Sequence, residues 1–148
     1  MDSDFEAIRS HLTSYFQGRS EVIAALLFGS RAQGRARSTS DVDIALFIRP
    51  ELWPGDDPLG YQAAVLFDLT RRLERDAVDL VVLNDATLPL AYRVISQGRL
   101  LFCQDPAVWT AFVVDVKRRY IDTKPLRQIQ AQYLYRRIRN GHFSRIPP

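Results

Sequence analysis

The chain has 148 residues, is 47% hydrophobic and 25% charged, and carries a net charge of +3, which is typical of one globular domain. No apolar run approaches the roughly 18 residues of a membrane-spanning helix. Cys103 is the single cysteine, which excludes an internal disulfide, and no Cys/His spacing typical of zinc occurs. Because the first ten residues, MDSDFEAIRS, are acidic and polar, unlike a signal peptide, we expect a cytoplasmic protein with no membrane contact.

The first half of the chain predicts a helix, two strands and the segment that joins them. Apolar side chains recur at helical spacing over residues 4–17, after an S-x-x-E capping pattern. Continuous apolar runs over 22–28 and 42–48 predict buried strands. Between the strands we expect one helical turn over 31–34 and a polar loop over 36–40.

The middle of the chain predicts a further alternation of helices and strands. Proline and glycine indicate a loop over 52–60, and an amphipathic pattern indicates a helix over 61–75. A third strand is expected over 78–83. A short helix over 88–97 and a last short strand over 99–102 then follow.

Two helices complete the predicted elements. Asp105 and Pro106 form a good N-cap and first-turn pair for a helix that reaches about Tyr120. Pro125 separates this helix from a second one over 126–139. The order of elements predicts an α/β (α+β) fold, in which a small mixed β-sheet is flanked by helices and followed by a helical C-terminal extension.

Charge distinguishes this extension from the rest of the chain. We assign residues 1–104 to the sheet-containing domain and 105–148 to a basic helical extension packed on it. From Lys117 onward the chain has nine Lys or Arg and one Asp, a net +8, which leaves −5 for the preceding residues. Such a segment is either a solvated helix face or a surface for an anionic partner, which would be an acidic protein, the nucleotide or RNA.

The segment 29–43, GSRAQGRARSTSDVD, contains the first candidate metal ligands. Asp41 and Asp43 are two positions apart, so on a strand they share one face while Val42 points into the core. Two such carboxylates repel each other unless a cation lies between them. Magnesium prefers oxygen ligands of this kind, and two ions about 4 Å apart can bridge the reacting groups of a nucleoside triphosphate.

The start of the same segment has the features of a phosphate-binding turn. Gly29 allows the backbone to come close to a ligand, and the following N–H groups and the Ser30 hydroxyl can donate to phosphate oxygens. Arg31 is a candidate for the β/γ end of the triphosphate, although it is equally compatible with a solvated loop. For Arg35 and Arg37 we favour the solvated interpretation.

Asp79 is the third candidate acid. It opens the apolar run DLVVL, and if that strand lies beside 42–48, Asp79 completes a triad with Asp41 and Asp43. In that position it can bind a metal ion and accept the proton of an attacking hydroxyl. Asp76 is the alternative, but it does not adjoin the apolar run.

These motifs resemble the DNA polymerase β-like nucleotidyltransferases, in which G-S is followed ten residues later by D-x-D and then by an acid on a neighbouring strand. The stretch AVDLVVLNDATLPLAYRVISQGRLLF further resembles the minimal nucleotidyltransferases of the MntA antitoxin group. The resemblance covers about residues 5–140. It implies a nucleotidyltransferase fold, phosphate binding by Gly29 and Ser30, and the following catalytic metal ligands: Asp41, Asp43 and Asp79.

The resemblance also implies an activity and a partner. MntA proteins transfer AMP from ATP to a tyrosine of a HEPN-domain ribonuclease toxin, HepT, and so neutralise it. Two other functions remain open. One is an antitoxin that blocks the toxin by stoichiometric binding, and the other is a nucleotidyltransferase that acts on RNA or on a small molecule such as an antibiotic. The short C-terminal segment argues against the small-molecule acceptor, since antibiotic-modifying members usually carry a larger substrate domain.

Overall fold

The computed structural model describes residues 2–29, 32, 41–75 and 77–140. Its elements in chain order are α1 (Asp2–Gln17), β1 (Val22–Phe28), β2 (Val42–Ile48), η1 (Pro50–Leu52), α2 (Pro58–Leu73), β3 (Val78–Val82), η2 (Leu83–Asp85), α3 (Leu88–Gln97), β4 (Arg99–Cys103), α4 (Pro106–Asp122) and α5 (Lys124–Arg139). This order confirms the predicted mixed fold. The helical turn and polar loop expected between β1 and β2 lie outside the described residues, apart from Ala32, which is buried.

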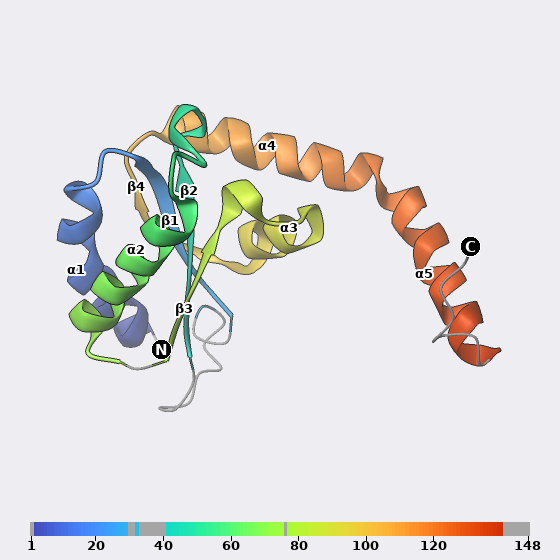
Figure 1. Cartoon of the computed structure of the whole chain (residues 1–148), viewed down its shortest axis with the longest axis horizontal. Coiled ribbons are helices and arrows are strands. Elements are labelled where there is room, and N and C mark those ends of the chain that lie inside the picture. Colours follow the sequence, from blue (N-terminus) through green and yellow to red (C-terminus); the bar gives the residue numbers. More distant parts are fainter. Residues whose placement is uncertain (1, 30–31, 33–40, 76, 141–148) are drawn as a thin grey trace.

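The four strands form one mixed sheet in the order β3-β2-β1-β4. β2 and β3 are parallel, whereas β1 pairs with β2 and with β4 in antiparallel fashion. Helices α1 and α2 cover one face and helices α3 and α4 cover the other (Figure 1). No helix in the described ranges is long and apolar enough to cross a membrane.

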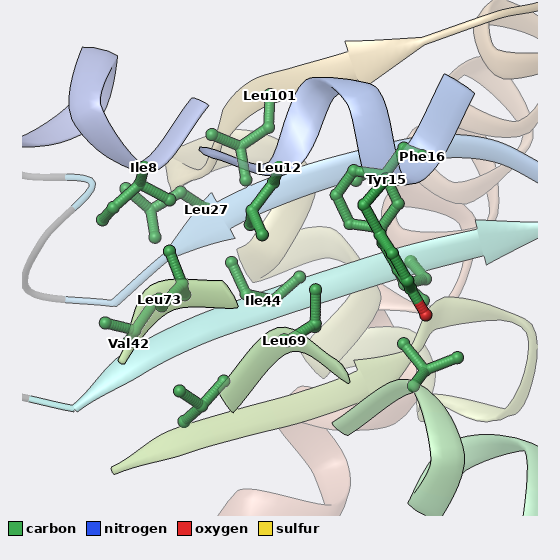
Figure 2. Close-up of a cluster of buried hydrophobic side chains, with 14 of the residues drawn as sticks. Ile8, Leu12, Tyr15, Phe16, Leu27, Val42, Ile44, Leu69, Leu73 and Leu101 are labelled. Carbon is green, nitrogen blue, oxygen red and sulfur yellow. The ribbon is translucent and has the colours of Figure 1, made fainter. Parts of the chain in front are cut away.

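The core between the sheet and helices α1 and α2 is built mainly from aliphatic side chains. Figure 2 shows side chains of both helices pointing onto the strands. Leu12 and Leu69 from the helices and Ile44 from β2 are all fully buried. Burial of such side chains stabilises the fold by about 1.5–3 kcal/mol each.

The opposite face of the sheet has an aromatic core. Phe47 of β2 stacks on Phe112 of α4, with ring centroids 4.1 Å apart, and also contacts Trp109. Val116, one helical turn after Phe112, is buried against the same face. These contacts fasten α4 to the sheet.

The start of α2 differs from the sequence-based prediction. The helix begins at Pro58 rather than at Tyr61, and the predicted loop 52–60 also contains the last residue of the short helix η1. Asp57 is the N-cap, and its side chain accepts a hydrogen bond from the Gly60 N–H at 3.0 Å. Aspartate followed by proline is the same start signal that was recognised at Asp105, where the structure confirms it.

The last helix, α5, behaves differently from the rest of the molecule. Figure 1 shows α4 extending past α3 and α5 (red) turning downward from its end. None of the residues of α5 is buried. Helix α4 packs on the sheet, whereas α5 has no buried residue. The boundary placed after residue 104 stays a prediction.

Candidate active site

The end of β1 and the starts of β2 and β3 lie side by side at one end of the sheet. Asp43, the second residue of β2, pairs with Phe28 at the end of β1 on one side and with Asp79 of β3 on the other. Gly29 follows directly after β1. The topology thus places at one point two of the predicted acids and the predicted phosphate-binding glycine, which are 50 residues apart at most in the sequence.

The acids face the side of the sheet that carries α3 and α4. Val42 and Ile44 are buried in the core beneath α1 and α2, as predicted, so Asp43 between them points to the opposite face. Asp79 shares this face, because register partners on adjacent strands point the same way. Asp41 precedes β2 and is exposed.

The electrostatics of Asp43 indicate a crowded negative site. Partial burial raises the pKa of the Asp43 carboxyl, and the negative charges of Asp79 and Asp41 raise it further, as does a hydrogen bond with Asp79. All these influences oppose ionisation of the same group. A divalent cation would relieve the repulsion and favour the ionised form.

Gly29 has a conformation and a position that require glycine. Its φ is +76°, a left-handed value that side chains other than glycine rarely adopt. A Cβ atom added here would overlap the Asp43 carboxylate. The backbone at Gly29 therefore passes directly against the Asp43 carboxylate.

The donor chemistry fits magnesium. Asp43 and Asp79 offer hard carboxylate oxygens, and magnesium takes one or two carboxylates from a protein while water and phosphate oxygens complete its shell. Among the described residues, no group of three or more His, Cys, Asp or Glu side chains lies close enough together to hold a metal ion. Asp43 and Asp79 thus form the paired part of the site, and the role of Asp41 as a third ligand stays a prediction.

Several predicted site residues lie outside the described part of the chain. Ser30 and Arg31 are among them, and so are Arg35, Arg37 and Asp76. Their assignments stay predictions.

Asn84 makes a contact at the other end of β2 from Asp43 that the sequence does not predict. Its side-chain amide accepts a hydrogen bond from the Ile48 N–H and donates one to the Ile48 carbonyl, both at 2.9 Å. Asn84 thereby continues the pairing of β2 beyond the end of β3 and helps fix the register in which Asp43 meets Asp79. In the sequence, Asn84 signals only that a strand has ended.

A glycine turn and acids on adjacent strands of a small mixed sheet define the class of nucleotidyltransferases. The model of the family described as polymerase β nucleotidyltransferase matches residues 10–107. The chain therefore belongs to the polymerase β nucleotidyltransferase family. Among curated proteins, no significant match exists.

Solved structures with a similar fold include toxin–antitoxin complexes. They agree with the similarity to the MntA group that the sequence motifs indicate. A toxin–antitoxin with AMP-PNP is 24% identical, with a TM-score of 0.68 over 88% of this chain and 98% of the other. A mutant MntA–HepT toxin–antitoxin is 25% identical, with a TM-score of 0.66 over 88% and 96%. The third structure is a tri-AMPylated HEPN toxin of Shewanella oneidensis in complex with an MNT antitoxin. Its matching chain is 22% identical, with a TM-score of 0.64 over 90% of this chain and 98% of the other.

Proposed function

We propose that this protein is an antitoxin that transfers AMP from ATP to a tyrosine of a HEPN-domain ribonuclease and so neutralises it. The observation that carries the proposal is the pairing of Asp43 with Asp79 beside the left-handed Gly29. Family membership supports nucleotidyl transfer. The toxin–antitoxin complexes of similar fold, one with AMP-PNP and one with an AMPylated toxin, support the nucleotide and the acceptor.

In the proposed reaction, the tyrosine oxygen attacks the α-phosphorus of ATP. The bond from this phosphorus to the oxygen that bridges to the β-phosphate breaks, and diphosphate leaves with the bonding electron pair. Asp79 accepts the proton of the tyrosine hydroxyl. The products are AMP-tyrosine and diphosphate, so all atoms and charges are accounted for.

The other residues of the site orient the triphosphate. Asp41, Asp43 and Asp79 would hold magnesium, which supplies positive charge against the phosphate oxygens. Gly29 allows the backbone to approach the triphosphate, and Ser30 and Arg31 donate hydrogen bonds and charge to it. Because the acids lie on the face that carries α3 and α4, the acceptor tyrosine has to arrive from that side.

Two differently labelled samples of ATP test the type of transfer. The full chain is incubated with magnesium, a HEPN-domain ribonuclease as the partner protein, and ATP labelled at either the α- or the γ-phosphate. We expect the α-label on the partner protein and none of the γ-label. Transfer of the γ-label would indicate phosphoryl transfer instead, and an α-label that migrates with RNA would indicate an RNA acceptor.

Stoichiometric inhibition is the second candidate, and the large apolar side chains exposed on α5 favour it. Asp41→Asn/Asp43→Asn separates the two functions, since it removes the negative charge and keeps the shape of the site. We expect the double variant to bind the toxin and leave its ribonuclease activity intact. Full neutralisation by the double variant would show that binding alone is sufficient.

A further inference from the structure

Helix α5 exposes an unusual number of large apolar side chains. Ile129 is 62% exposed and Leu134 is 46% exposed, and four further members of the set are more than half exposed: Leu126, Tyr133, Tyr135 and Ile138. Scattered single apolar residues on a surface are ordinary, but a helix with six of them and none buried is not. Such a helix needs a partner to cover it.

Most of these side chains lie on one side of α5. At about 100° per residue, Leu126, Ile129 and Tyr133 follow one stripe, and Leu134 and Ile138 widen it on one side. We call these five residues the apolar face. The opposite side carries Gln128, Gln132 and Arg139. Gln130 and Arg137 fall among these five residues, so the face combines apolar side chains with a cation. None of the side chains of α5 is buried by the part of the chain that the structure describes.

The joint between α4 and α5 is fastened by aromatic and cationic contacts. The guanidinium of Arg127 lies 3.5 Å from the centroid of the Tyr120 ring and donates a hydrogen bond to the Tyr120 carbonyl at 2.6 Å. It also donates to the Thr123 hydroxyl. The ring of Tyr120 in turn stacks on Tyr92 of α3, with centroids 3.8 Å apart and planes 2° apart. Arg127 therefore fixes α5 to α4 and, through Tyr120, to α3.

The contacts between α4 and α5 place α5 on the same side of the sheet as Asp43 and Asp79. Helices α3 and α4 cover the face of the sheet toward which Asp43 and Asp79 point. A protein bound along α5 would accordingly be held on the side from which the acceptor has to arrive. Binding at a separate surface is one way in which an enzyme brings a protein substrate to its reacting groups.

We propose that the apolar face of α5 binds the partner ribonuclease, through an apolar surface of the partner that is rimmed by acidic side chains. The identity of the partner rests on the proposed function, whereas the surface and its chemistry rest on α5. Charge selects the acidic rim, because α5 carries five Lys or Arg and no acid: Lys124, Arg127, Arg136, Arg137 and Arg139.

The same observations disfavour the other occupants. RNA binding uses planar side chains that stack on bases, whereas Leu126, Ile129, Leu134 and Ile138 are aliphatic. A second copy of this chain would bring two helices of like charge together, which costs free energy. A protein with an apolar surface and acidic side chains around it can cover the apolar side chains and pair with the cationic ones.

Two matched double variants test the proposal in the full chain. Ile129→Glu/Leu134→Glu places two acids on the apolar face, and Gln128→Glu/Gln132→Glu makes the same change of charge on the opposite side of the helix. All four positions are exposed, so both variants should fold. Affinity for a HEPN-domain ribonuclease, the proposed partner, is measured by calorimetry. We expect the first variant to bind at least about 30-fold more weakly, and the second within about threefold of the unchanged chain.

The remaining outcomes separate this proposal from the proposed function. Equal losses in the two variants would overturn the apolar face as the binding surface. Absence of binding by the unchanged chain, with binding of a single-stranded RNA or self-association in its place, would overturn it as well. Binding that depends on Ile129 and Leu134 without any transfer of AMP would support the docking surface and contradict the transferase function.

Discussion

Asp43 of β2 and Asp79 of β3 lie directly opposite each other on two parallel strands, and partial burial together with the charge of Asp79 raises the pKa of the Asp43 carboxyl. Such a neighbour is unfavourable for folding, because the charge of Asp79 raises the cost of ionising Asp43. A protein retains such a pair where a ligand compensates the charge. The pairing of Asp43 with Asp79 therefore affects both the stability of this end of the sheet and its function.

Asp43→Asn should lower activity and raise stability together. Loss of the carboxylate should reduce AMP transfer at least about 100-fold, since both metal binding and charge placement are affected. Without divalent ions, the free energy of unfolding at pH 7 should rise by about 0.5 kcal/mol. The repulsion between Asp43 and Asp79 is removed, but solvent screening keeps the gain small. Thermal unfolding and transfer assays measure the two effects. Asp56→Asn, an exposed acid elsewhere, should change neither.

Gly29→Ala should be far more harmful than the same change at Gly18. Alanine at Gly29 would be strained by the left-handed φ and would displace the Asp43 carboxylate. We expect a loss of about 1–2 kcal/mol in the free energy of unfolding, together with loss of transfer activity. At Gly18 an added Cβ meets only backbone oxygens at 3.6 and 3.8 Å, which is ordinary contact. Equal stability and activity of the two variants would show that the Gly29 geometry is unimportant.

Tyr61→Phe should destabilise the fold in a pH-dependent manner. The Tyr61 hydroxyl donates to Glu21 at 2.7 Å, and Arg19 forms an ion pair with the same carboxylate at 3.3 Å. Burial alone would raise the pKa of Glu21, but these hydrogen bonds and the charge of Arg19 outweigh it and lower the pKa below 4.5. At pH 7 the variant should lose about 1 kcal/mol of unfolding free energy.

The sign of the pH effect follows from the lowered pKa of Glu21. Ionised Glu21 contributes stability above pH 4.5, and this contribution is lost as the pH falls through the pKa of the folded state. The difference between Tyr61→Phe and the unchanged chain should therefore shrink in acid, as measured by urea unfolding over this range. Tyr135→Phe, at an exposed position, should have little effect at any pH. A difference that stays constant into acid would rule out the ionic contribution.

Arg127→Met should loosen the joint of α5 without disturbing the acids. The hydrogen bonds to Tyr120 and Thr123 and the contact with the Tyr120 ring would be lost. We expect binding of the partner to weaken about fivefold, because a less ordered helix loses more conformational freedom on binding. The rate of AMP transfer at saturating partner should stay unchanged. Arg127→Lys should recover part of the affinity, and Arg136→Met is the matched control. A lower rate of AMP transfer with unchanged affinity would contradict a role of Arg127 in positioning α5.

Much of the fold is readable from local sequence patterns. The apolar runs predict β1 and β2 with the observed bounds, and Asp105-Pro106 predicts the start of α4. Alternation along β2 also predicts the face of Asp43, because a strand with one acid among buried neighbours has only one orientation that keeps the carboxylate out of the core.

The features that escape prediction depend on residues distant in the sequence. The sequence predicts Asp79 as a candidate but not its exact register with Asp43, and the bond of Asn84 to Ile48 spans 36 positions. The detachment of α5 was missed for another reason. Its apolar spacing is that of a helix packed on a domain, and only the structure shows that the described part of the chain buries none of its residues.

Intact-mass measurement of the partner protein tests the central claim most directly. A HEPN-domain ribonuclease, the proposed partner, is incubated with ATP, magnesium and either the unchanged chain or its Asp43→Asn variant. We predict that the partner gains the mass of one or more AMP units on a tyrosine with the unchanged chain, and none with the variant. An unmodified partner whose ribonuclease activity is nevertheless abolished by both chains would contradict catalysis and leave inhibition by binding.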